Sequence, residues 1–167
     1  IYNVKCMGFL CDGSSPDSVR ILFDNIKDFA DDIEVLVNNA GISIVGLLQD
    51  MSDDDWRNIV DSNLSSVFYM CRAIIPSFLK KKHGRIINVS SVWGEYGASC
   101  EVAYSATKGG INSFSRALGK ELAPSGITVN AVAFGAVDTE MNSFLSDEER
   151  DMLIDEIPSG HIATPDE

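Results

Sequence analysis

The stretch GRIINVSS, residues 84–91, decides the kind of fold that this sequence forms. Its largely apolar centre at residues 85–89 predicts a strand that is buried on both faces. Comparable runs occur at residues 4–10, 33–37 and 127–133. Strands of this kind are typical of parallel sheets with helices on both faces, so we expect an α/β protein.

Helical periodicity fills the segments between these runs. Helices are expected at residues 16–29, 53–82, 103–123 and 147–157, and Ser15, Ser52 and Ser146 are expected as N-caps. Gly84 is expected to end the second helix. The alternation predicts a doubly wound parallel sheet of the Rossmann type, formed as a single domain over residues 1–167. Ligands of such sheets bind at the carboxyl ends of the strands, here the loops at residues 12–13, 38–41, 90–91 and 134–139.

Composition narrows the classes of function. The 167 residues are 45% hydrophobic, enough for one core, and the net charge of −12 argues against nucleic acid and anionic membranes as partners. No apolar run approaches the ~18 residues that a membrane span needs. The four cysteines, Cys6, Cys11, Cys71 and Cys100, lack the spacing of a metal site or a disulfide framework. We therefore expect reduced thiols in a cytoplasmic protein without a metal.

Several polar residues lie where chemistry is expected. Tyr104 and Lys108 are four apart on one helix face, and an ammonium beside a phenol lowers the pKa of that phenol. Ser91 follows a strand, but no G-x-S-x-G pattern marks it as a hydrolase nucleophile. Asn63 interrupts an apolar stripe, and a buried amide needs hydrogen-bond partners. Either neighbouring backbone or water supplies them, or Asn63 holds a water in a functional network. The glycines at 109–110 lie in mid-helix and predict close packing.

Five motifs follow one another along the chain. They are NNAG at 38–41, NLSSVF at 63–68, GRIINVSS at 84–91, YSATK at 104–108 and VNAVAFGAVDTEM at 129–141. In this order and spacing they resemble the short-chain dehydrogenase/reductase family, and within it the 3-oxoacyl-[acyl-carrier-protein] reductases. The resemblance implies reduction of a carbonyl to an alcohol with NADP(H), or alternatively NAD(H), in a homodimer or homotetramer.

The resemblance also implies a role for each candidate residue. Tyr104 would give a proton to the carbonyl oxygen as hydride reaches the carbon. Lys108 would lower the pKa of Tyr104 and hold the ribose hydroxyls of the nicotinamide. Ser91 would hydrogen-bond the carbonyl oxygen, and Asn63 would hold a water that links Lys108 to solvent. The implied cofactor contacts are Asp12, Gly13, Asn38, Asn39, Ala40, Gly41, Tyr104, Lys108, Gly135, Val137 and Thr139.

The sequence departs from the family pattern in two places. Phe134 stands where the family has proline before Gly135, which is expected to loosen that turn without removing its backbone contacts. The glycine-rich turn that receives the pyrophosphate, the first βαβ unit and the last strand of the family are not among these residues. A non-catalytic fragment or structural subunit is therefore an alternative from another class of protein.

The substrate is the least defined part of the resemblance. The loop at 93–104 is similar to elongation factor P 5-aminopentanone reductases, in which case Glu95 and Glu101 would face a cationic amine. Both residues are otherwise solvated loop carboxylates. The basic run at 80–83 would dock an acidic carrier protein or form a solvated helix end.

Overall fold

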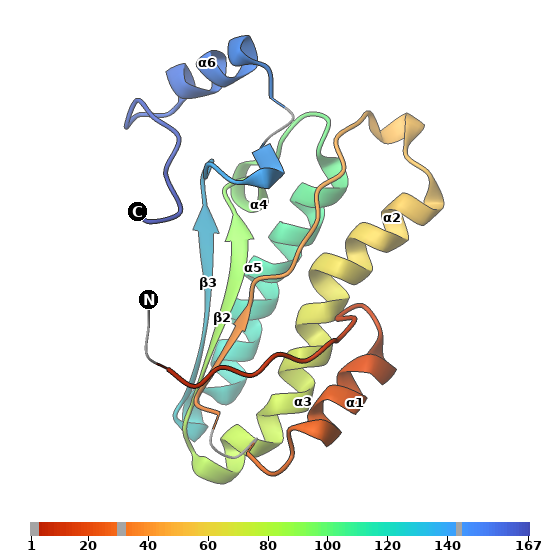
Figure 1. Cartoon of the computed structure of the whole chain (residues 1–167), viewed down its shortest axis with the longest axis vertical. Helices are drawn as coiled ribbons and strands as arrows, with labels where there is room; N and C mark the ends of the chain where they lie inside the picture. Colours follow the sequence, from red (N-terminus) through yellow and green to blue (C-terminus); the bar gives the residue numbers. More distant parts are fainter. Residues whose placement is uncertain (1–3, 30–32, 143–144) are drawn as a thin grey trace.

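A computed structural model describes residues 4–29, 33–142 and 145–167, which form a parallel sheet backed by helices (Figure 1). The strands are β1 Val35–Asn38, β2 Gly84–Ser91 and β3 Ile127–Phe134, in the spatial order β1-β2-β3. Both neighbouring pairs run parallel, with Ile86 opposite Leu36 on one side and Val129 on the other. The strands predicted at residues 33–37, 85–89 and 127–133 are confirmed, because their branched side chains fit a pleated sheet.

The helices follow the predicted order. They are α1 Pro16–Asn25, α2 Asp53–Val60, α3 Ser66–Lys81, α4 Trp93–Tyr96, α5 Val102–Leu122 and α6 Asp147–Glu156, with 3-10 turns at Leu48–Asp50, Ala123–Ser125 and Glu140–Asn142. A π-helical turn, Asp61–Ser65, joins α2 to α3. The N-caps Ser15, Ser52 and Ser146 each accept a hydrogen bond from the backbone N–H three residues later, as predicted. No helix in the described ranges is long and apolar enough to cross a bilayer.

Two local details differ from the sequence-based expectation. Helix α3 ends at Lys81 and is capped by Lys82, whose φ of 53° is left-handed, whereas Gly84 is the first residue of β2. The loop after β2 contains the short helix α4, which the sequence pattern did not predict.

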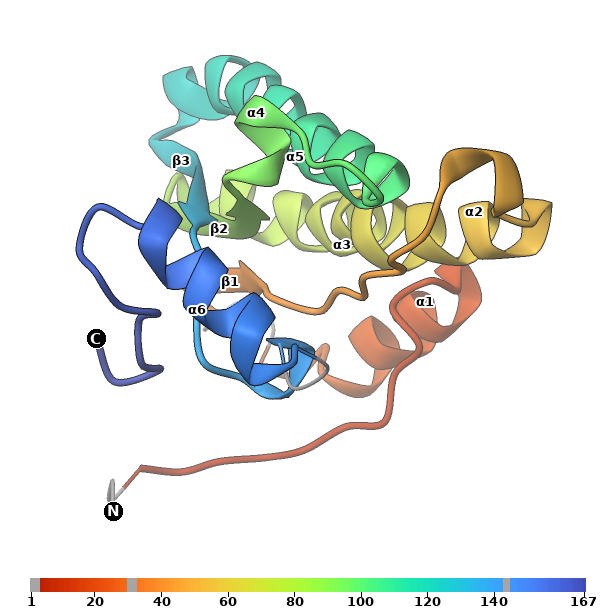
Figure 2. The same ribbon diagram turned by 90° about the horizontal axis from the view of Figure 1, so that it is seen from above.

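The core lies between the sheet and the pair α3 and α5, which lie side by side behind it (Figures 1 and 2). Phe78 from α3, Ile86 from β2, Ile111 from α5 and Ile127 from β3 are at most 1% exposed. Burial of such side chains stabilises the fold by about 1.5–3 kcal/mol each before entropy is counted. This packing fixes the direction in which α5 runs across the strands.

The opposite face of the sheet is open in the described part of the chain. Val35 and Val37 of β1 and Val132 of β3 are 48%, 54% and 41% exposed. The doubly wound prediction placed helices on both faces, but α3 and α5 cover only one. The parallel Rossmann-type sheet is thus confirmed, while the helical cover of its second face is not seen among these residues.

Residues 4–10 do not form the strand that their apolar pattern predicted. They have no regular structure, Val4 is 74% exposed, Leu10 is fully exposed, and the segment runs apart from the sheet (Figure 2). A strand requires a neighbour for its backbone hydrogen bonds, and none of the described strands pairs with this segment. The prediction of a strand at residues 4–10 was wrong, because an apolar pattern does not show whether a neighbouring strand is available for pairing.

Candidate active site

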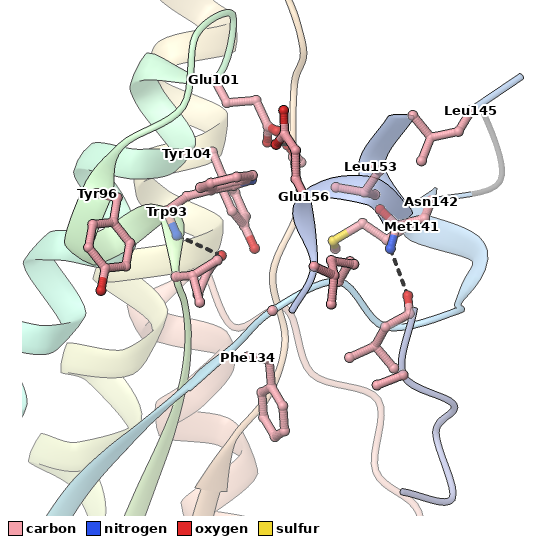
Figure 3. A pocket seen from close by; sticks show the side chains of 18 of the residues that line it. Trp93, Tyr96, Glu101, Tyr104, Phe134, Met141, Asn142, Leu145, Leu153 and Glu156 are labelled. Atoms are coloured by element: carbon pink, nitrogen blue, oxygen red, sulfur yellow. Dashed lines mark hydrogen bonds between the residues drawn. The ribbon is translucent and has the colours of Figure 1, made fainter. Parts of the chain in front are cut away.

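A cavity of about 770 Å³ opens where β2 and β3 end (Figure 3). Ser91, the last residue of β2, and Phe134, the last residue of β3, both line it. Most of its wall is apolar and includes Val45, Trp93, Tyr96, Met141, Leu145, Leu153, Ile157 and Pro158. Tyr104 and Glu101 add polar groups from the start of α5. The cavity therefore lies at the carboxyl edge of the sheet, where the sequence predicted a ligand crevice.

Tyr104 and Ser91 form the polar end of the cavity. Both side chains line it, and Ser91 Oγ accepts a hydrogen bond from the backbone N–H of Trp93 at 3.2 Å. Burial raises the pKa of Tyr104; the neighbouring hydroxyl of Ser91 opposes this rise, and the charge of Glu101 adds to it. The phenol is therefore protonated at neutral pH, which is the state that a general acid needs.

Lys108 lies one helical turn after Tyr104 and is 4% exposed. Its ammonium donates to the backbone carbonyl of Val89 at 2.9 Å and lies 5.5 Å from the centre of the Tyr104 ring. Burial lowers the pKa of Lys108. We predicted that this charge would lower the pKa of Tyr104, whereas burial raises that pKa overall. Burial of the phenol dominates, and the ammonium lies over the ring and bonds to Val89.

Asn63 is fully buried in the π-helical turn, and both N–H groups of its amide are used. Its oxygen accepts from the backbone N–H of Ile42 at 2.8 Å, and its nitrogen donates to the carbonyl of Ile42 at 2.9 Å and to Thr107 Oγ1 at 3.1 Å. A Cβ on Gly41 would lie 3.2 Å from that oxygen and 3.5 Å from Lys108 Nζ. Asn63 is thus brought next to Lys108 as predicted, but both of its N–H groups bond to protein and neither is left for a water.

Some of the predicted cofactor residues line the cavity, and the others lie outside it. Val137 and Gly135 line the cavity after β3, whereas Thr139 is exposed and accepts the N–H of Asn142 through its carbonyl. Asn39 and Ala40 are exposed beyond the end of β1.

The side chain of Asn38 turns away from solvent. Its nitrogen donates to Asn88 Oδ1 at 2.8 Å, and Asn88 donates in turn to Ser115 Oγ of α5 at 2.8 Å. The amide nitrogen of Asn38 is therefore engaged within the protein. This bonded series ties β1, β2 and α5 together beneath the cavity.

Asp12 and Gly13 lie before α1, beside the start of α3. A Cβ on Gly13 would lie 3.4 Å from Cβ of Ser66. The carboxylate of Asp12 accepts from the hydroxyl and the N–H of Ser14, and these bonds lower the pKa of Asp12. The two residues thus form an exposed turn separate from the residues that line the cavity.

The structure separates the two predicted substrate carboxylates. Glu101 lines the cavity and accepts a hydrogen bond from Ser43 Oγ at 2.7 Å. Glu95 of α4 does not line it, and its carboxylate accepts from Asn112 at 2.9 Å and from Arg116 at 3.0 Å. The structure does not place Glu95 where a substrate contact was predicted, because α4 turns this side chain towards α5.

Helix α4 lies very close to α5, and glycines make this possible. A Cβ on Gly94 would lie 2.7 Å from the carbonyl carbon of Lys108, and a Cβ on Gly109 would lie 3.2 Å from the carbonyl oxygen of Gly94. A Cβ on Gly110 would meet Leu64 at 3.0 Å. The close packing predicted for the glycines at 109–110 is confirmed. It sets the loop after Ser91 directly against the turn that carries Lys108.

The C-terminal segment supplies a cavity wall that the sequence reasoning missed. Leu153 and Ile157, four residues apart around the acidic helix α6, face the cavity with Glu156 and His161. The spacing of the two apolar residues was the available signal. His161 pairs with Glu167 at 3.0 Å, and this hydrogen bond raises the pKa of His161.

The basic run at 80–83 lies at the other end of the sheet. Its last residue precedes Gly84, where β2 begins, whereas the cavity lies beyond Ser91, where β2 ends. Lys81 donates to the backbone carbonyl of Ile33. This position does not place the run at the cavity, so the geometry does not favour it as a dock for a carrier-linked substrate.

Comparison with known proteins gives consistent matches over most of the chain. The family model of the short chain dehydrogenases matches residues 2–150. The 3-oxoacyl-[acyl-carrier-protein] reductase FabG of Escherichia coli (strain K12) is 39% identical over 93% of this chain, and that of Haemophilus influenzae is 40% identical over 95%. The uncharacterized oxidoreductase YmfI of Bacillus subtilis (strain 168) is 46% identical over 81%.

These relatives are longer than this chain. The matched part spans 64%, 65% and 56% of their respective lengths. Among solved structures, a protein of Agrobacterium tumefaciens for which gluconate dehydrogenase activity has been proposed superposes with a TM-score of 0.89 and 29% identity. The superposition covers 92% of this chain and 62% of that protein. Sequence and fold agree, and the chain belongs to the short-chain dehydrogenase family.

Proposed function

We propose that this protein reduces a ketone to an alcohol with NADP(H), and that Tyr104 is its general acid. The observation that carries the proposal is that Tyr104 and Ser91 lie together at the polar end of the cavity, with Lys108 one helical turn after Tyr104. When bound, a nicotinamide cofactor would supply the hydride that reduces the carbonyl carbon. The phenol of Tyr104 donates its proton to the carbonyl oxygen, and the hydroxyl of Ser91 stabilises the charge that develops there.

Lys108 fits the ribose of such a cofactor. Its ammonium has three N–H donors, of which one bonds to Val89 in the described structure. The other two N–H groups suit hydroxyl acceptors, and the nearby Gly41 leaves room beside Nζ. Asn39, Ala40, Gly135 and Val137 would form further contacts at the edge of the sheet. We propose NADP(H) over NAD(H) because of the likeness to FabG proteins.

A 3-oxoacyl thioester or a related ketone is the proposed substrate. The apolar wall of the cavity suits an acyl chain, and the names of the FabG relatives specify this class. A second candidate is an amino-ketone of the elongation factor P type. The position of Glu101 in the cavity favours this candidate, because a carboxylate attracts an ammonium.

The wider setting of the protein is also proposed. The four cysteines are free thiols, which suits the reducing environment of the cytoplasm, and we propose that location.

We propose a homodimer or homotetramer built on α3 and α5, whose outer surfaces carry exposed Phe68 and Leu79 on α3 and Val102 on α5.

The Tyr104→Phe substitution tests the proposal in the full-length protein. It removes the hydroxyl and leaves the ring in place, so oxidation of NADPH with an acetoacetyl thioester should fall about a thousandfold, within the range known for loss of a general acid. Binding of NADPH, followed by its fluorescence, should stay within about threefold. Turnover within tenfold of the wild type would overturn the role of Tyr104.

A further inference from the structure

We infer that Thr107 is a positioning residue of the proposed reduction, because its hydroxyl links Asn63 to the helical turn that carries Tyr104. Thr107 is 1% exposed and lies between Tyr104 and Lys108 on α5. Its Oγ1 accepts a hydrogen bond from Asn63 Nδ2 at 3.1 Å and donates one to the carbonyl of Tyr104 at 2.8 Å. The inference rests on the proposed function, although the link itself does not.

The hydroxyl of Thr107 is needed because it both accepts and donates a hydrogen bond. A side chain at this position must accept from an amide and donate to a carbonyl at the same time, and only serine and threonine do this at similar size. Valine has the shape of threonine without either capacity. With valine, one N–H of Asn63 would be buried without a partner, which is more costly than losing an exposed hydrogen bond.

The link joins two parts of the site that are far apart in sequence. Asn63 holds the backbone of Ile42 through two hydrogen bonds, in the turn that follows β1. Through Thr107 the same amide also holds α5, 44 residues further along. Gly41, which precedes Ile42, lies against Lys108. Thr107 therefore keeps the turn after β1 in a fixed position relative to Tyr104 and Lys108.

A shift of the turn after β1 relative to Tyr104 and Lys108 should affect the chemical step more than substrate binding. Thr107 does not line the cavity, so its hydroxyl has no contact with substrate. A displacement of about 1 Å at reacting groups lowers rates up to a hundredfold. Loss of Thr107 should therefore lower kcat and leave the KM for the ketone nearly unchanged.

The test compares Thr107→Val, Thr107→Ser and the matched control Thr128→Val in the full-length protein, with NADPH and an acetoacetyl thioester. Thr128 is exposed on β3, so its substitution should leave kcat unchanged. Thr107→Val should lower kcat about tenfold, the factor that 1.4 kcal/mol represents, with KM within about threefold. Thr107→Ser should recover most of this loss. A folded Thr107→Val protein with kcat within twofold of the wild type, or a serine variant as slow as valine, would overturn the inference.

A double substitution tests whether Thr107 acts through Asn63. In an Asn63→Leu background the amide is absent, so adding Thr107→Val should change kcat less than about twofold. If the two substitutions lowered kcat independently, so that their factors multiplied, Thr107 would act by another route and the inference would be overturned.

Side-chain NMR gives a readout that needs neither turnover nor a folded valine variant. The Nδ2 hydrogens of Asn63 should exchange slowly with solvent in the wild type and in Thr107→Ser, because both are bonded in the interior. Fast exchange in either protein would overturn the link. A wild type that reduces no ketone but protects these hydrogens would defeat the proposed function and leave the link intact.

Discussion

The ammonium of Lys108 bonds to the backbone carbonyl of Val89 at 2.9 Å and lies 5.5 Å from the centre of the Tyr104 ring. The helical spacing of four residues places both side chains on one face of α5. Strand β2 then decides where the charge is held, because it supplies the acceptor. The lysine is almost fully buried without an ion-pair partner in the described part of the chain, so it is held at a cost in stability.

We expect Lys108→Met to stabilise the full-length protein at neutral pH while removing its activity. Burial lowers the pKa of Lys108 below its ordinary value of 10.5. Between the two pKa values the unfolded chain binds more protons than the folded one, so the free energy of unfolding falls as pH falls through this window. The cost is therefore larger at pH 7 than near pH ~10.5, and removing it at pH 7 should raise the free energy of unfolding by about 1 kcal/mol.

Urea denaturation at pH 7 and near pH ~10.5 measures this effect, since the difference from the wild type should shrink at the higher pH. Lys120→Met is the control, because Lys120 is exposed near the end of the same helix. A lower stability of Lys108→Met at pH 7 would show that the bond to Val89 outweighs the cost of burial.

We expect Gly94→Ala to destabilise the protein and to impair the site. The added Cβ would lie 2.7 Å from the carbonyl carbon of Lys108 and 2.9 Å from the nitrogen of Gly109, both of which are backbone atoms that cannot turn aside. Overpacking of this kind costs roughly 1–3 kcal/mol. Denaturation and kcat should both respond. Gly46→Ala is the control, because no atom lies within 4 Å of the Cβ it adds. Equal stability of the two variants would contradict the close approach of α4 to α5.

Glu101→Gln should separate the two candidate substrates. A charge-assisted contact is worth roughly 1.5–3 kcal/mol, so kcat/KM for an amino-ketone should fall about ten- to hundredfold. The value for an acyl thioester should stay the same or rise. Glu95→Gln is a matched control, because Glu95 bonds to Asn112 and Arg116 outside the cavity. Equal effects of Glu101→Gln on both ketones would remove the amino-ketone from consideration.

We expect the full-length protein to form a dimer that Phe68→Asp weakens. Phe68 is 42% exposed on α3, and the guanidinium of Arg72 lies 4.7 Å from the centre of its ring. Aromatic and arginine side chains are enriched among the residues that carry interface affinity. The dissociation constant from analytical ultracentrifugation should rise at least about tenfold. Leu48→Asp, on an exposed 3-10 turn, should have little effect. A wild type that is monomeric at high concentration would contradict this expectation.

Local sequence patterns determined the elements and the identity of the central residues. The apolar run within residues 84–91 was sufficient to predict β2, and Ser15, Ser52 and Ser146 were sufficient to predict three helix starts. The spacing of Tyr104 and Lys108 was sufficient to place both on one side of α5. Such patterns succeed because hydrogen bonds and side-chain neighbours within a helix are only three or four residues apart.

Tertiary structure decided which partner each side chain finds. Glu95 and Glu101 lie in the same loop region of the sequence, yet only Glu101 faces the cavity, because Gly94 lets α4 dock on α5 and turns Glu95 towards Arg116. The pKa of Tyr104 rises although a lysine is one turn away, because burial of the phenol depends on the whole surrounding fold. Contacts between residues that are distant in sequence arise only when the elements pack, and neither spacing nor composition encodes that packing locally.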